Sequence, residues 1–284
     1  MRLASILAAG RSSVGVVRDE RVLPLDPAED AFGSIRAIAA GGEAGLGRIR
    51  AWVAEQPERA WFAVDDVDLG PAVADPGAIY AIGRNYSASA AGEPDPDRPD
   101  RPLVYAKQPT SVAGSGAVLS WDRALTVNVD AEVELAVVIG ETAEAVAPGQ
   151  ALRHVFGYTC INDISSRDPW LDGDQWLLGK SIGGFCPVGP WIVTPDDIRP
   201  DRLRLGCTIN GLAIQDGESS RMRFGVADVI SYLSRHVTLR PGDLIATGTP
   251  PRLAGPPGPD RHLEPGDEVT CWIEGIGQLT TTVA

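Results

Sequence analysis

The segment from Asp130 to Gly140 begins with acidic residues and continues directly into apolar ones, and this combination constrains the fold most strongly. Its second half holds five consecutive apolar residues, three of them β-branched, which predicts a buried strand. Alternate residues of a strand share a face, so Asp130, Glu132 and Glu134 should point the same way. Neighbouring carboxylates repel one another, and burying an ionised group is costly unless something compensates its charge.

Two interpretations of this acidic cluster remain open at this point. In one, the segment is an exposed edge strand whose acids face water. In the other, a divalent cation lies between the carboxylates, and the apolar continuation of the strand favours this interpretation. The cluster contains no His or Cys, which favours an oxygen-binding ion (Mg²⁺, Mn²⁺ or Ca²⁺) over zinc.

Composition excludes several classes of protein. The 284 residues suffice for one large or two modest domains, and 44% hydrophobic with 22% charged residues is typical of a globular protein. A net charge of −13 disfavours nucleic acid and anionic membrane as partners. No apolar run is long enough for a membrane-spanning helix, and the apolar start of the chain is too short for a signal peptide, so we interpret it as a strand.

The cysteines have no spacing typical of a zinc site or a disulfide framework. They are interpreted as buried free thiols, which indicates a reducing cytoplasm as the location. The four residues are Cys160, Cys186, Cys207 and Cys271.

The pattern of residues suggests two domains, with a boundary near the Asp75-Pro76-Gly77 turn. Residues 1–72 should form a small N-terminal α/β domain. It contains a hairpin over 14–25, helical composition over 28–40 and 49–56, and a flexible glycine-rich link over 41–47. Residues 73–284 should form the catalytic domain.

The second domain is expected to consist mostly of strands, so the predicted class is α+β, mostly β, arranged as a barrel or roll. The clearest helix spans 226–236, where apolar residues share one stripe. Residues 92–101 form a polar, proline-rich loop that could act as a lid. The predicted strands are 79–82, 103–107, 130–140, 155–161, 186–193, 203–210, 243–247, 269–273 and 278–283.

Three further segments carry residues suited to chemistry, and each has a plainer explanation. The polar run 162–168 follows a strand and could be only a turn. Lys180 is isolated among apolar and glycine residues, and could be a surface lysine or part of a structural ion pair. The segment 247–250, Thr-Gly-Thr-Pro, offers hydroxyl and N–H donors to an anion, or is simply a tight turn.

Taken together, these pieces closely resemble the fumarylacetoacetate hydrolase family in order and spacing. The resemblance covers residues 78–284, and the N-terminal unit resembles the variable small domain that family members carry. The segments that carry it are Gly83–Tyr86, Lys107, Glu132–Leu135, Gly157–Tyr158, Asn162–Asp163, Ser166–Asp168, Lys180, Pro187–Pro190, Ile209–Gly211, Gln215–Gly217, Leu239–Asp243 and Thr247–Pro250.

The resemblance implies the family's mixed β-roll catalytic domain, usually as a homodimer. It implies Glu132, Glu134 and Asp163 as ligands of Mg²⁺ or Mn²⁺, with Ca²⁺ left open by the oxygen-only ligand set. It implies Lys180 as a catalytic residue that stabilises negative charge on a substrate oxygen. The positions assigned to substrate binding are Arg84, Tyr86, Lys107, Arg167 and Thr249.

The family acts on small β-dicarbonyl or 2-oxo acids, and its reactions are hydrolytic C–C cleavage, decarboxylation and keto–enol isomerisation. All three pass through an enolate, which a Lewis-acidic cation and a nearby ammonium group stabilise. The metal and the lysine therefore imply enolate chemistry, and other residues select the outcome.

The sequence departs from the family where hydrolytic members carry a water-activating His-Glu pair. Ser89 and Gly92 stand at these positions, with Glu93 displaced by one. Serine is a poor base at neutral pH, so Ser89 does not simply replace histidine, and Glu93 is the other catalytic candidate. His262 could approach the site from its loop, and Arg252 could add a cation near the substrate.

Three hypotheses follow. The first is a metal-dependent C–C hydrolase in which the metal or Glu93 activates water. The second is a decarboxylase, isomerase or other lyase of the same family, which needs no activated water. The third is a catalytically inactive metal-binding scaffold, disfavoured by the intact set of acids and Lys180.

Overall fold

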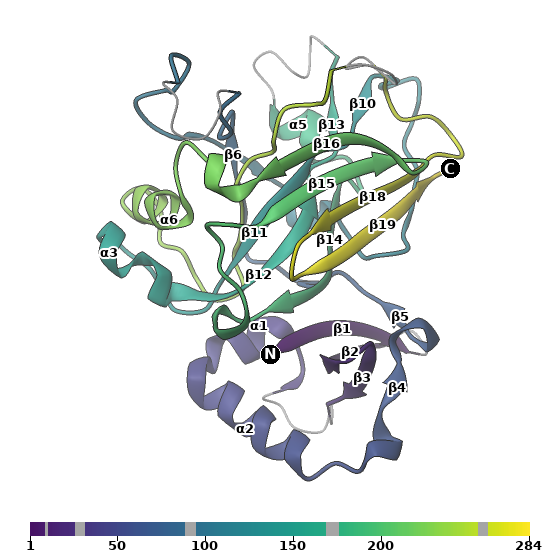
Figure 1. Ribbon diagram of the computed structural model, residues 1–284, viewed down its shortest axis with the longest axis vertical. Helices are drawn as coiled ribbons and strands as arrows, with labels where there is room; N and C mark the ends of the chain where they lie inside the picture. The colour runs from purple at the N-terminus through teal and green to yellow at the C-terminus, as the bar shows by residue number, and fades with distance from the viewer. Residues whose placement is uncertain (9–10, 26–31, 89–94, 169–175, 255–260) are drawn as a thin grey trace.

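The computed structural model describes residues 1–8, 11–25, 32–88, 95–168, 176–254 and 261–284. It is an α+β protein in which strands predominate, as predicted (Figure 1). None of the described helices is both long and apolar enough to cross a membrane. The helices are α1 (Ile35–Ala40), α2 (Gly42–Ala54), α3 (Pro148–Ala151), α5 (Trp176–Lys180) and α6 (Val226–Ser234).

One large sheet runs through the whole molecule, in the order β4-β3-β2-β1-β14-β12-β11-β17-β6-β7. Two short strands join its side, β5 on β1 and β8 on β14. Its strands are β1 (Arg2–Ala8), β2 (Arg11–Arg18), β3 (Arg21–Pro24), β4 (Phe62–Ala63), β5 (Asp68–Leu69), β6 (Ile79–Gly83), β7 (Leu103–Lys107), β8 (Val112–Ala113), β11 (Val133–Ile139), β12 (Val155–Asn162), β14 (Cys186–Val193) and β17 (Leu244–Ala246).

A second sheet packs against the middle of the first, in the order β16-β15-β18-β19-β9 (Figure 1). A separate pair, β10 (Val129–Asp130) with β13 (Ser165–Ser166), lies next to the start of β11 and the end of β12. The strands of the second sheet are β9 (Val118–Leu119), β15 (Arg204–Ile209), β16 (Leu212–Glu218), β18 (Glu268–Ile273) and β19 (Gly277–Val283).

Strand β11 is buried along its whole length, which explains its apolar sequence. Leu135 and Val137 pack into the core between the two sheets, together with residues of β15, β18 and β19. Ala136 and Val138 point to the opposite face, into the core that the large sheet shares with α1 and α2. Both faces of the strand are therefore dry, and Glu134 lies on the second face at its start.

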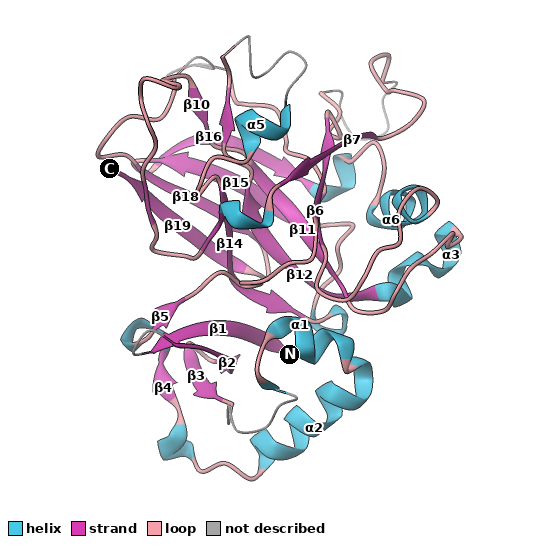
Figure 2. Cartoon of the chain, turned by 180° about the vertical axis from the view of Figure 1, so that it is seen from behind, coloured by secondary structure: helices cyan, strands magenta, loops and turns pink. Residues whose placement is uncertain are grey.

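The predicted hairpin in the N-terminal unit is confirmed, because β2 pairs with β3 through a turn at Asp19 and Glu20. The predicted boundary falls in the connection between β5 and β6. The N-terminal unit lies below the larger part in both views (Figures 1 and 2). The two parts are nevertheless joined, because β1 pairs with β14 and the core against α1 and α2 includes residues of both parts.

The prediction of a flexible link over residues 41–47 is wrong, because helix α2 begins at Gly42. Gly42 itself has φ +54°, so the chain reverses there between α1 and α2. A β-carbon on Gly45 would lie 3.2 Å from the carbonyl oxygen of Ile38, so this glycine permits close packing of the two helices. Gly42 marks the reversal and Gly45 the close helix–helix contact, which the sequence alone did not distinguish from a linker.

Gly157 on β12 provides a test of the packing between β12 and β14. An alanine β-carbon there would lie 2.4 Å from Ile192 Cγ2 and 2.7 Å from the Val193 carbonyl oxygen. Gly157→Ala should therefore lower the free energy of unfolding by about 1–3 kcal/mol, measured by urea denaturation. Gly149→Ala is the matched control, since nothing lies within 4 Å of its added carbon. Equal stability of the two variants would contradict this packing.

Candidate functional site

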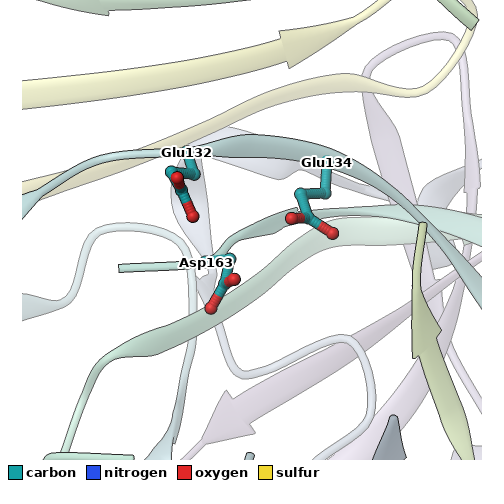
Figure 3. Close-up of side chains that lie close together, drawn as sticks. All are labelled: Glu132, Glu134 and Asp163. Carbon is teal, nitrogen blue, oxygen red and sulfur yellow. The ribbon is translucent and has the colours of Figure 1, made fainter. Parts of the chain in front are cut away.

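The register of β11 and β12 brings three carboxylates together. Val133 pairs with Asn162, and the next backbone bond runs from Asp163 N to Glu132 O at 2.8 Å, so Asp163 lies opposite Glu132. Glu134 shares the face of Glu132 two residues further along. Each of the three acids offers an oxygen within 4.8 Å of the others, and their side chains lie close together (Figure 3).

The turn after β17 holds the third carboxylate, that of Glu134. Gly248 N donates to Glu134 Oε2 at 2.7 Å. Gly248 has φ +97°, and a β-carbon there would lie 2.7 Å from the Cβ of Asn85, so the position requires glycine. The Asn85 amide donates to Thr247 O at 2.7 Å, which fixes this turn against the segment that follows β6.

Two buried ammonium groups compensate Asp163, the acid that directly follows β12. Lys180 Nζ lies 2.5 Å from Asp163 Oδ2 and 2.9 Å from Glu132 Oε2. Lys107 Nζ donates to Asp163 Oδ1 at 2.6 Å. These are the only two lysines in the 284-residue sequence, in which every other basic side chain besides the histidines is arginine. A compact ammonium group can direct its three N–H donors to acceptors on different sides, whereas a guanidinium presents its donors in one planar fork.

These contacts fix the protonation states of the ion-paired groups. Burial by itself would raise the pKa of Asp163, but the charges of Lys107 and Lys180 outweigh burial and lower it. Burial would lower the pKa of Lys180, but Asp163 and Glu132 raise it above its ordinary value. Asp163 is therefore ionised and Lys180 is charged at neutral pH.

Glu134 is in a different electrostatic situation. Among the described residues it forms no ion pair, and its carboxylate accepts one hydrogen bond, from Gly248 N. Burial, followed by the charges of Asp163 and Glu132, raises its pKa well above the ordinary value. Three oxygen-donor acids, one of them lacking a cation, are a ligand set that fits Mg²⁺ or Mn²⁺.

A cavity of about 180 Å³ opens onto this cluster. It brings together most of the residues expected from the sequence, although those residues come from distant segments. Those of the sequence-derived candidates that line it are Arg84, Glu132, Glu134, Arg167, Lys180 and Thr249. Thr249 Oγ donates to Val133 O at 2.8 Å, so its hydroxyl proton is already engaged with the strand.

The remaining candidates are placed elsewhere. Lys107 is fully buried behind Asp163 and does not line the cavity, so its contact is with the acid rather than with the space for substrate. Tyr86 borders an adjoining larger cavity, and its hydroxyl is buried without a hydrogen-bond partner in the described structure. Ser89 and Glu93 lie outside the described residues.

Asp130 is separate from the group of three acids. Its carboxylate accepts from Arg167 Nε at 3.0 Å and from Arg252 at 3.1 Å, and lies 2.9 Å from His262 Nδ1. Arg167 also forms an ion pair with Glu132. The other two histidines, His154 and His236, lie against backbone carbonyl oxygens and do not line the cavity.

Sequence reasoning missed several residues that support the site. The Tyr105 hydroxyl donates to Asp163 Oδ2 at 2.6 Å, and the ring of Trp176 packs edge-on against Tyr105 at 5.2 Å. Ser165 Oγ lies 2.7 Å from Lys180 Nζ. Tyr105 precedes Lys107 by two residues on a strand, so their shared face was a usable signal. Trp176 and Ser165 gave no such signal, because only the tertiary structure brings them here.

The sequence model of the family described as fumarylacetoacetate (FAA) hydrolase C-terminal matches residues 78–284. The chain belongs to the fumarylacetoacetate hydrolase family. The matched region contains all the cavity-lining residues and the three clustered acids, so the family resemblance and the geometry concern the same site.

Solved structures of the family are similar over the whole chain. A fumarylacetoacetate hydrolase from Exiguobacterium antarcticum is 31% identical with a TM-score of 0.86, covering 100% of this chain and 99% of that one. A maleylpyruvate hydrolase from Sphingobium sp. SYK-6, solved with manganese(II) and pyruvate, is 27% identical with a TM-score of 0.81 and coverage of 100% and 99%. A 5-carboxymethyl-2-hydroxymuconate delta-isomerase from Mycobacterium smegmatis is 28% identical, with a TM-score of 0.79 and coverage of 100% and 98%.

Replacing Glu134 by glutamine should separate metal binding from stability. The amide keeps an oxygen for Gly248 N but removes a carboxylate whose raised pKa makes its ionised form destabilising at neutral pH. In metal-free buffer we expect Glu134→Gln to have a higher Tm than the wild type, and its Tm should no longer rise when Mg²⁺ or Mn²⁺ is added. Glu144→Gln, at an exposed acid, is the control. A Tm increase by metal that survives in Glu134→Gln would contradict the ligand assignment.

Metal binding should also release protons. A carboxylate ligand binds in its ionised form, and the pKa of Glu134 is raised by burial and by the neighbouring acids. The apparent affinity should thus fall as pH drops below this raised pKa, by up to about tenfold per pH unit for one proton. Calorimetry in two buffers of different ionisation enthalpy measures the released protons. A binding enthalpy that is the same in both buffers would contradict the prediction.

Proposed function

We propose that this protein is a divalent-metal-dependent enzyme that acts on a β-dicarbonyl or 2-oxo acid through an enolate, with hydrolytic C–C cleavage as its reaction. The observation that carries the proposal is the position of Lys180. Its charged Nζ lies between Glu132 and Asp163 at the wall of the cavity that also contains Glu134. An ammonium group beside a candidate metal site is suited to stabilising an oxyanion.

A bound Mg²⁺ or Mn²⁺ would supply Lewis-acid stabilisation of negative charge on substrate oxygens. Glu132, Glu134 and Asp163 are proposed to hold it. Lys107, from behind, and Tyr105, at the cavity wall, keep Asp163 in place. This contact favours a positioning role for Lys107 in place of the substrate contact expected from the sequence.

Arg84 and Arg167 are proposed to bind the carboxylate of the substrate. Both line the cavity, and among the described residues the Arg84 side chain forms no ion pair or hydrogen bond. Arg84 also has φ +54°, a backbone conformation that is strained for a residue with a side chain. Such strain commonly accompanies a functional position. Thr249 and Tyr86 are proposed to shape the pocket around the substrate.

Hydrolysis needs a group that activates water, and this requirement leaves a second candidate function. No histidine lines the described part of the cavity. Ser89 and Glu93 stay proposals for this role, with Glu93 the better base. Without such a group, the same enolate chemistry would give a decarboxylase or isomerase, and an inactive metal-binding scaffold is the remaining alternative. The homodimer and the cytoplasmic location also stay proposals.

Product analysis with the metal-loaded protein distinguishes these reactions. With acetylpyruvate we expect acetate and pyruvate, and no products after chelation of the metal. Release of CO₂ from oxaloacetate without cleavage of acetylpyruvate would favour the decarboxylase. The absence of turnover with these and other β-dicarbonyl acids, in protein shown to bind metal, would contradict the proposal and favour the scaffold.

Variants of Lys180 test the proposed catalytic group. Lys180→Met should lower kcat by about 100-fold or more, the loss typical of removing one oxyanion-stabilising donor. Lys180→Arg should lose nearly as much, because the planar fork of a guanidinium does not reproduce the contacts of Nζ with Glu132, Asp163 and Ser165. Arg199→Met, which removes an exposed charge, is the control. Activity of Lys180→Met within a few-fold of the wild type would exclude the assigned role.

A further inference from the structure

The backbone conformation of Arg84 is held in place by a second arginine, Arg223. Arg84 has φ +54°, in the left-handed region where a residue with a side chain is strained, so its surroundings must impose this conformation. Arg223 binds two successive carbonyl oxygens there. Its Nη1 donates to Arg84 O at 2.9 Å, and its backbone N donates to Asn85 O at 2.6 Å. A cavity-lining residue therefore depends for its conformation on a residue 139 positions further along the chain.

Asp95 in turn fixes the guanidinium group of Arg223. Nε of Arg223 lies 2.7 Å from Asp95 Oδ2, and Nη2 lies 2.9 Å from Oδ1, which makes a bidentate ion pair. The two side chains are only 8% and 14% exposed. Hydrogen bonding from Arg223 lowers the pKa of Asp95, so the pair is ionised at neutral pH. A largely buried pair is screened less by water and salt than an exposed one, and it holds Arg223 in one position.

The residue after Arg223 completes the support. Phe224 N donates to Asn85 Oδ1 at 2.9 Å, and the Asn85 amide donates to Phe224 O at 3.0 Å. The same amide donates to Thr247 O at 2.7 Å. Residues 84 and 85 are therefore held between the segment that precedes α6 and the turn that carries Gly248, one of the groups bound to the three acids.

This support determines the direction of the Arg84 side chain. Without it, Arg84 would return to a negative φ, which is sterically favoured, and its side chain would leave the backbone in a different direction. Arg223 is itself unsuited to binding a substrate, because each of its three guanidinium nitrogens is already engaged, two with Asp95 and one with Arg84 O. The contacts of Arg223 are those of a residue that acts through Arg84.

We propose that Arg223 and Asp95 are positioning residues, which hold the backbone of Arg84 so that its guanidinium group receives the carboxylate of a 2-oxo acid. This inference rests on the proposed function for the carboxylate-binding role of Arg84. Because the ion pair forms without substrate, Arg84 needs little reorganisation when the carboxylate binds. Loss of the pair should weaken the binding of a 2-oxo acid and leave the binding of the metal ion unchanged.

Pyruvate and Mn²⁺ are the two probes that measure this effect by calorimetry. Arg223→Met should raise the dissociation constant of the Mn²⁺-loaded protein for pyruvate by about tenfold, the factor expected when a left-handed conformation must be restored on binding. Asp95→Asn should act in the same direction with a smaller change. The dissociation constant for Mn²⁺ should stay as in the wild type in both variants. Arg202→Met, at an exposed arginine, is the control and should change neither value.

A double variant shows whether Arg223 acts through Arg84. In an Arg84→Gln background, Arg223→Met should change the dissociation constant for pyruvate by less than about twofold, because the guanidinium group to be positioned is gone. A tenfold loss that persists in this background would overturn the proposal, since Arg223 would then act independently of Arg84. An unchanged affinity for pyruvate in Arg223→Met would overturn it too. So would affinities for pyruvate and Mn²⁺ that fall together, as expected from general damage to the site.

The remaining outcomes separate this inference from the proposed function. If Arg223→Met does not fold, Asp95→Asn takes its place, and an unchanged affinity for pyruvate in that variant would count against the positioning role. Mn²⁺-loaded wild-type protein that binds no pyruvate would also contradict this role, whether or not it cleaves acetylpyruvate. The predicted loss of pyruvate affinity, in protein that cleaves no β-dicarbonyl acid, would support the positioning role and contradict the proposed reaction.

Discussion

The structure depends on how repulsion among three neighbouring carboxylates, two of them fully buried, is compensated. Glu132 and Glu134 lie two residues apart on the same face, and Asp163 lies opposite the first of them. Two ammonium groups neutralise Asp163, whereas Glu134 is left with a single backbone donor. This asymmetry explains why the pKa of Asp163 is lowered and that of Glu134 is raised, although both are fully buried. It also indicates where a divalent cation would contribute most.

The elements around the acids serve to keep this charge arrangement rigid. The turn after β17 supplies Gly248, the segment after β6 supplies Asn85, β7 supplies Tyr105, and α5 ends at Lys180. These segments are far apart in the sequence and meet at the ends of adjoining strands of one sheet. Side chains fixed from several directions need little reorganisation when a ligand binds, which is the condition for electrostatic stabilisation of an enolate.

Local sequence patterns predicted the parts of the fold that depend on the alternation and hydrophobicity of neighbouring residues. Alternation placed Glu132 and Glu134 on one face, and apolar runs placed the main strands of both sheets within a few residues. Strand β16 was not assigned, although Asn210-Gly211, both with positive φ, is a turn signal that predicts a hairpin with β15. Only the first half of helix α2 was taken for a linker, because the close packing that Gly45 permits is visible only in three dimensions.

The site was predictable only in part for the same reason. That Asp163 faces Glu132 depends on the register of two strands, and the sequence suggested this pairing through family resemblance and not through spacing. The burial of Lys107 behind Asp163 and the position of Arg252 at a cavity wall depend on packing between distant segments. Residue types and order therefore indicated the chemistry, while the structure was needed to assign supporting and binding positions.

A crystal structure of the protein soaked in Mn²⁺, with anomalous diffraction recorded at the manganese edge, tests the central claim most directly. The account predicts one strong anomalous peak within about 2.0–2.4 Å of an oxygen of each of Glu132, Glu134 and Asp163. No peak at the three acids, with Lys180 still bridging two of them at saturating metal, would contradict it.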